Sequence, residues 1–149
     1  MINKQYVEAI ILFNNVAVFQ VNNINGKEEH SFIKIETNKE GVVEEAILSH
    51  IKSITEMECS ILFSISSIVR KNHRTFLIEL HSDNLSEKDI IDKLEELTNM
   101  QRNIELISLE NLNKYNDIDK LYFEALIIEC NSKKYFPNWY YKIKNIVER

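Results

Sequence analysis

The chain has 149 residues, enough for one domain with one hydrophobic core, and we expect a single domain over residues 1–149. Its 18 basic and 23 acidic residues give a formal net charge of −5, so no overall positive field attracts a nucleic-acid backbone and no nucleic-acid partner is expected. Only two glycines, Gly26 and Gly41, are present. This excludes a glycine-rich phosphate loop and a dinucleotide fingerprint, because each needs several glycines close together.

The two cysteines and the apolar runs are typical of a protein from the cytoplasm. Cys59 and Cys130 are far apart and neither belongs to a C-x-x-C pair, so we expect free thiols. The longest apolar run near the N-terminus, residues 9–13, is far shorter than the roughly 20 residues that cross a bilayer. We therefore expect a cytoplasmic location and no membrane partner.

The residue patterns near the N-terminus predict β-strands. Residues 6–13 and 16–21 are rich in β-branched and aromatic residues, and the Asn-Asn pair between them tolerates positive φ, so we predict a hairpin. The polar residues 22–29 predict a loop with a turn at Asn25 and Gly26. Apolar positions at residues 32–35 then predict a third strand.

The apolar spacing next changes to three or four residues, which indicates a helix over residues 42–57. Val43, Ile47, Ile51 and Ile54 form one apolar face of this helix. We expect these four side chains to be buried against the sheet.

The rest of the chain predicts strands alternating with helices. Strands are expected over residues 60–69, 75–81 and 104–109, and helices over residues 87–97 and 117–130 and from the segment around Trp139 to residue 147. Ser86 is a suitable N-cap for the first of these helices. Such an arrangement predicts one α/β or α+β sandwich.

The order of these elements resembles the Nudix (MutT-like) superfamily. Residues 44–46 match without gaps the Glu-x-Ala of that family's central helix. Residues 107–112, Ile-Ser-Leu-Glu-Asn-Leu, are similar to a later segment that in many members reads Trp-Val-Ser-Leu-Glu-Glu-Leu. The resemblance covers most of the chain and implies the fold class α/β, a Nudix-like α/β/α sandwich with a mixed sheet.

The chain departs from the family at the residues that carry the family's chemistry. In the same alignment, the helix positions that read Arg-Glu and then Glu-Glu in the family are Ser49, His50, Ser53 and Ile54. Family members use these carboxylates to hold Mg²⁺ on a diphosphate. The resemblance therefore implies a degenerate member with no catalytic residue and no metal ligand on this helix.

The candidate pocket lies beside the helix face formed by Ala46, Ser49, His50 and Ser53. A histidine can bind a metal, donate to a phosphate or act as a base. No second His, Cys or acid stands at ligand spacing on the helix, however, which favours a solvated or hydrogen-bonded histidine. The other three histidines predict no constellation; they are His30, His73 and His81.

We expect a catalytically degenerate Nudix-fold protein that acts as a nucleotide-derivative-binding or regulatory module. Two alternatives stay open. One is a Nudix hydrolase that cleaves a nucleoside diphosphate derivative, such as ADP-ribose or a nucleoside triphosphate, with non-standard metal ligands. The other is a protein-interaction subunit with an empty pocket, whose contact surface is the aromatic cluster around Trp139. No cofactor is expected, except Mg²⁺ if the protein is hydrolytic; the expected partner is a nucleotide-like small molecule or a protein, and a homodimer stays open.

Overall fold

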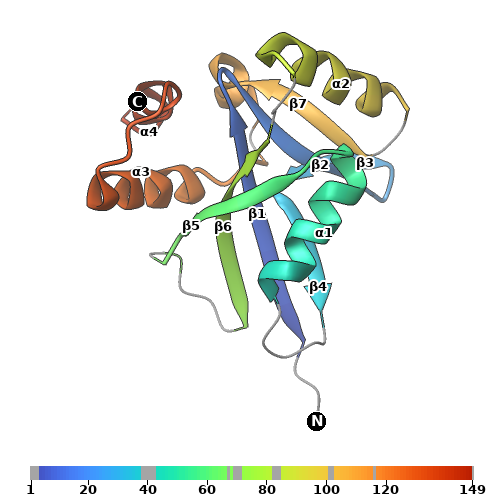
Figure 1. Cartoon of the computed structure of the whole chain (residues 1–149), viewed down its shortest axis with the longest axis horizontal. Coiled ribbons are helices and arrows are strands. Elements are labelled where there is room, and N and C mark those ends of the chain that lie inside the picture. The colour runs from blue at the N-terminus through green and yellow to red at the C-terminus, as the bar shows by residue number, and fades with distance from the viewer. Residues whose placement is uncertain are drawn as a thin grey trace.

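One mixed β-sheet with helices on both faces forms the protein (Figure 1). The computed structural model describes residues 4–37, 43–66, 68, 72–81, 85–100, 103–115 and 117–148. The strands are β1 (Gln5–Phe13), β2 (Val16–Ile24), β3 (Lys27–Ser31), β4 (Ile33–Thr37), β5 (Cys59–Ser64), β6 (His73–Leu80) and β7 (Ile104–Ser108). The helices are α1 (Val43–Thr55), α2 (Glu87–Asn99), the 3-10 helix η1 (Leu109–Lys114), α3 (Leu121–Lys133) and α4 (Tyr140–Val147).

Strand β1 lies at the centre of the sheet. The strand order is β3-β2-β1-β6-β5, with β4 paired to β1 and β7 paired to β2. β1 and β6 run parallel, whereas the other pairs are antiparallel, so the sheet is mixed as predicted. Because successive side chains of a strand point to opposite faces, β1 supplies side chains to the cores on both sides.

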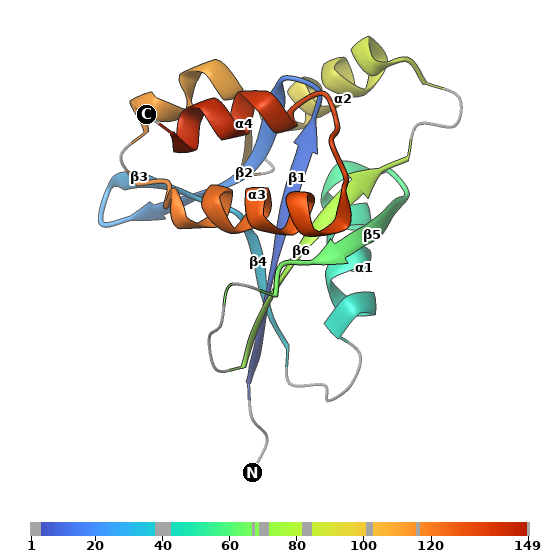
Figure 2. The same ribbon diagram turned by 90° about the vertical axis from the view of Figure 1, so that its left-hand side faces the viewer.

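Two α-helices cover each face of the sheet, and the 3-10 helix η1 adds to one of them. The core on one face joins Val7, Ala9 and Ile11 of β1 to side chains of α1 and α2. The core on the other face joins Ile10 and Leu12 to side chains of η1, α3 and α4. Figure 2 shows α3 and α4 in front of the sheet, on the side away from α1. The predicted α/β/α sandwich is therefore confirmed.

Helix α1 packs through the predicted face. Val43, Ile47 and Ile51 are buried, while Ile54 is only partly buried and packs at the margin of the same core. Thr55 is buried instead, and its hydroxyl donates to the carbonyl of Ile51 at 2.7 Å. The helix ends before the predicted residue 57 because residue 56 has a φ of +58°, which breaks helical geometry. The predicted first residue, 42, lies outside the described residues.

The loop predicted over residues 22–29 is wrong, because this segment contains the second hairpin. Strand β2 continues to Ile24, and β3 begins at Lys27. Asn25 and Gly26 between them have φ values of +54° and +79°, as a two-residue hairpin turn requires. Residues 23–29 of this hairpin are all exposed, and a strand segment without a buried face shows no apolar alternation in its sequence.

The other predicted strands and helices are present in the structure, and several of them begin or end at other residues than predicted. The strand predicted over residues 60–69 is β5, which ends at Ser64, and residues 67 and 69 lie outside the described residues.

Both cysteines are free; Cys130 is buried, and burial raises the pKa of its thiol to about 11. Among the described residues, no helix is long and apolar enough to cross a membrane.

Candidate functional site

A cavity of about 160 Å³ lies between the sheet and the start of α3. It brings together two histidines, three acids, a lysine and a group of aromatic rings. The lining residues are Glu8, Phe19, His30, Ser31, Phe32, Lys34, His73, Asp117, Ile118, Asp119 and Tyr122. Converging polar groups on an apolar floor are typical of a small-molecule site.

Glu8 places a carboxylate inside the sheet layer. It lies in the middle of β1 with only 5% of its surface exposed, and strand alternation points it toward α3, as it does Ile10. Its Oε1 atom accepts the hydroxyl of Tyr122 at 2.7 Å and contacts Nε2 of His73 on β6. A buried carboxylate without such partners costs several kcal/mol. The Glu8–His73–Tyr122 network therefore holds a polar group in an otherwise apolar layer.

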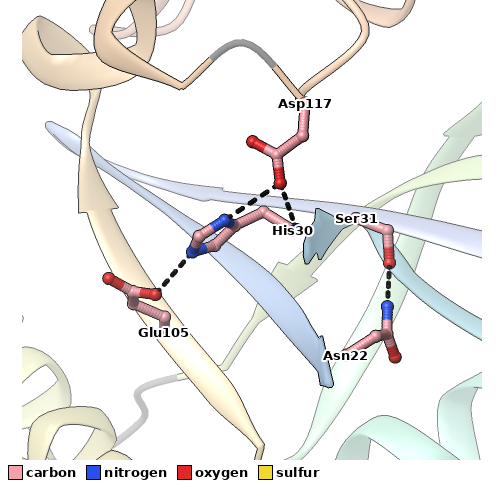
Figure 3. Close-up of polar contacts among 5 residues, drawn as sticks. All are labelled: Asn22, His30, Ser31, Glu105 and Asp117. Atoms are coloured by element: carbon pink, nitrogen blue, oxygen red, sulfur yellow. Dashed lines mark hydrogen bonds and ion pairs between the residues drawn. The ribbon is translucent and has the colours of Figure 1, made fainter. Parts of the chain in front are cut away.

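A second network surrounds His30 at the end of β3 (Figure 3). Its Nε2 atom lies 2.7 Å from a carboxylate oxygen of Glu105 on β7, and its Nδ1 atom lies 3.2 Å from Asp117, which precedes α3. The backbone N–H of His30 also donates to Asp117, at 2.5 Å. Three separate elements thus meet at one imidazole ring.

These contacts shift the pKa values of His30 and Asp117. Partial burial by itself lowers the pKa of His30, but the hydrogen bonds to Glu105 and Asp117 outweigh it and raise the pKa above 6.5. Burial by itself raises the pKa of Asp117, but the N–H groups of His30 outweigh it and lower the pKa below the ordinary value. The charged forms of both groups are therefore favoured.

Aromatic side chains form the apolar part of the cavity. Phe19 of β2 and Phe32 are both buried, and their ring centroids lie 5.1 Å apart. The ring of Tyr122 lies 5.0 Å from that of Phe32. At the exposed side, Lys34 of β4 places its ammonium 5.8 Å from the ring of Tyr6. The cavity thus combines flat apolar surfaces with a cation at its rim.

The predicted pocket residues do not lie in this cavity. Ala46, Ser49, His50 and Ser53 are on α1, which covers the opposite face of the sheet. Ser49 and Ser53 are exposed, whereas Ala46 and His50 are half-buried. Burial lowers the pKa of His50, which favours its neutral form. Ligand binding by this face of α1 stays a prediction.

The side chains of α1 do not fit magnesium. The predicted face offers an imidazole, two hydroxyls and a methyl group, whereas Mg²⁺ prefers carboxylate and water oxygens. At the start of the helix, the carboxylate of Glu44 already accepts a hydrogen bond from Arg74 at 2.7 Å. In the part of the chain that the structure describes, no group of three or more His, Cys, Asp or Glu side chains is placed to hold a metal ion.

The expectation that His30 and His73 belong to no constellation is wrong, since His73 contacts the buried Glu8 and His30 contacts both Glu105 and Asp117. The sequence does carry one signal for the site, because Glu8 is the single charged residue of an apolar strand. Trp139, the centre of the predicted contact surface, is buried in the core, although the nearby Phe136 and Tyr141 are exposed.

No family model and no curated protein matches this sequence. Among solved structures, the chain is similar to a hydrolase of the NUDIX family from Clostridium perfringens. The two share 12% sequence identity with a TM-score of 0.49, and the match covers 83% of this chain and 95% of the other. A likeness of this degree assigns no residue, ligand or reaction to this chain.

Proposed function

We propose that this protein is a binding module for a small planar ligand with a polar edge, such as the base of a nucleotide derivative. The ligand occupies the cavity between the sheet and the start of α3. The buried Glu8–His73–Tyr122 network beside the rings of Phe19 and Phe32 is the observation that supports this proposal most strongly.

The size of the cavity supports a ligand that is buried only in part. Sites for drug-sized molecules measure about 300–1,000 Å³. At about 160 Å³, this cavity accommodates one ring system. The rest of the ligand then extends past Lys34 at the rim, whose ammonium suits a phosphate group.

The polar groups in the cavity give a basis for selectivity. The carboxylate of Glu8 accepts hydrogen bonds, and the ring of His73 and the hydroxyl of Tyr122 lie beside it. A ligand that donates an N–H to this carboxylate satisfies it after water leaves the cavity. A ligand without a donor removes water from this carboxylate and offers no hydrogen bond in its place beyond those of Tyr122 and His73, which disfavours binding.

The side chains of α1 favour ligand binding without hydrolysis. The order of elements resembles the Nudix superfamily, and this resemblance suggests a nucleotide derivative among the planar ligands. In that family the central helix holds magnesium through carboxylates, whereas this helix has His50, Ser53 and Ile54 at the corresponding positions. We therefore propose a degenerate, regulatory member.

Calorimetry with ADP-ribose and nucleoside triphosphates, with and without Mn²⁺, tests the proposal. We expect at least one of these ligands to bind without Mn²⁺, and Glu8→Gln to weaken binding about tenfold or more because a charged acceptor is lost. The exposed Glu95 on α2 provides the matched control, and Glu95→Gln is expected to bind as the parent does.

Two results contradict the proposal. Release of nucleoside monophosphate in the presence of Mn²⁺ would support the hydrolase alternative. No binding of any ligand, by a parent chain shown to be folded by circular dichroism, would favour the protein-interaction alternative.

A further inference from the structure

His30 connects three elements at one wall of the cavity. It lies on β3, opposite Val21 of β2, and reaches across the face of β2 toward Glu105 on β7. On its other side it contacts Asp117, which begins the segment that leads into α3 (Figure 3). The imidazole therefore lies between two carboxylates that belong to different parts of the chain.

Both carboxylates can be bound by the ring only when His30 carries two protons. A neutral imidazole has one N–H donor and one lone pair, whereas an imidazolium has two donors. With Nε2 at 2.7 Å from Glu105 and Nδ1 at 3.2 Å from Asp117, each nitrogen faces a carboxylate oxygen. Loss of one proton turns one of these attractive contacts into a repulsion between a lone pair and a carboxylate.

The other groups around His30 do not replace that proton. The edge-on ring of Tyr115, which follows η1, has its centroid 4.8 Å from that of the imidazole. On β3 itself, Glu28 and Glu29 are exposed acids. Lys34 of β4 lines the same cavity as His30, and the other charged or titratable lining groups are Glu8, His73, Asp119 and Tyr122.

We propose that His30, Glu105 and Asp117 form a proton-operated latch on the cavity. When His30 is protonated, the latch holds the segment 117–119 against β3 and β7. When His30 is neutral, Asp117 keeps the backbone N–H of His30 but loses its attraction to the ring.

The segment held by the latch is part of the cavity wall. Asp117, Ile118 and Asp119 all line the cavity, and Asp119 accepts the backbone N–H of Leu121 at 2.9 Å where α3 begins. Loosening this segment moves the wall, so ligand affinity is expected to fall as the pH rises. This consequence rests on the proposed function, whereas the latch itself does not.

A titration of the unliganded protein by NMR, from about pH 5 to about pH 9, tests the latch. We expect the His30 ring to titrate above 6.5, and the amide signals of His30 and Leu121 to follow the same midpoint. In Asp117→Asn the His30 midpoint is expected to move down, because one carboxylate is lost. In His30→Gln the Leu121 amide is expected to lose this titration, whereas in the exposed control His81→Gln it is retained.

A His30 midpoint at or below 6.5 would overturn the latch. A Leu121 titration that persists in His30→Gln would overturn it as well. With ADP-ribose as the probe, affinity is expected to fall about fivefold across the His30 titration, the effect of losing one hydrogen bond, and less in His30→Gln. Absence of binding of both ADP-ribose and the nucleoside triphosphates at every pH counts against the proposed function, and the unliganded titration still decides the latch.

Discussion

Glu8, the one charged residue of β1, is the central polar residue of the candidate site. Its neighbours in β1 are apolar and buried, so its carboxylate is stable there only because Tyr122 and His73 bind it. A hydrophobic side chain at this position would pack without any partner. Under the proposed function, this carboxylate forms a selective hydrogen bond to the ligand, which an apolar residue could not do.

His30 makes the stability of the protein depend on pH, in a direction that follows from its pKa. Because the folded pKa lies above 6.5, the stabilisation by His30 is fully present below about pH 6.5 and is lost as the pH rises through the folded pKa. We expect His30→Gln to lower the free energy of unfolding by about 0.5–1.5 kcal/mol at pH 6, and by less at pH 9. Urea unfolding at both pH values measures this; an equal loss at both would contradict it.

The sequence contains a signal for Glu8 but not for its partners. A lone glutamate in an apolar strand predicts a buried charge. Its partner His73 is 65 residues away and reaches it through the parallel pairing of β1 and β6. Parallel pairing is set by tertiary packing, and no local periodicity encodes it. His30 and Asp117, 87 residues apart, were not predicted to be in contact either, because tertiary packing and no local pattern brings them together.

At the scale of elements, α1 was the most readable part of the chain. Its apolar face recurs every three or four residues, and this pattern is local, so Val43, Ile47 and Ile51 were correctly predicted as buried. The outer part of the β2–β3 hairpin, residues 22–29, was missed because these residues are mostly polar on both faces. Hydrophobic periodicity therefore identifies helices and strands that have one exposed and one buried face, and misses those that extend into solvent.

The packing of α1 gives a direct test at this scale. Ile51 is fully buried among residues of β1, β4 and β6, so Ile51→Ala is expected to lower the free energy of unfolding by about 2–5 kcal/mol. Ser53 is exposed on the same helix, and Ser53→Ala is expected to change it by less than about 0.5 kcal/mol. An unchanged urea midpoint for Ile51→Ala would show that the helix does not pack through this face.

At the scale of the whole molecule, the sheet separates two candidate sites. The predicted pocket lies beside Ala46 and His50 of α1 on one side, and the cavity with Glu8 and Tyr122 lies under α3 on the other. The resemblance in element order led to the first site, because it maps the chemistry of the central helix. At the second site, ionisable groups that are far apart in the sequence are brought together by folding.

Mapping of amide shifts in an NMR titration with ADP-ribose distinguishes the two sites most directly. We predict that the largest shifts belong to residues around the cavity, such as Glu8, Phe32 and Tyr122. Shifts concentrated on α1, around Ala46 and His50, or no shifts with ADP-ribose and none with nucleoside triphosphates, would contradict the account.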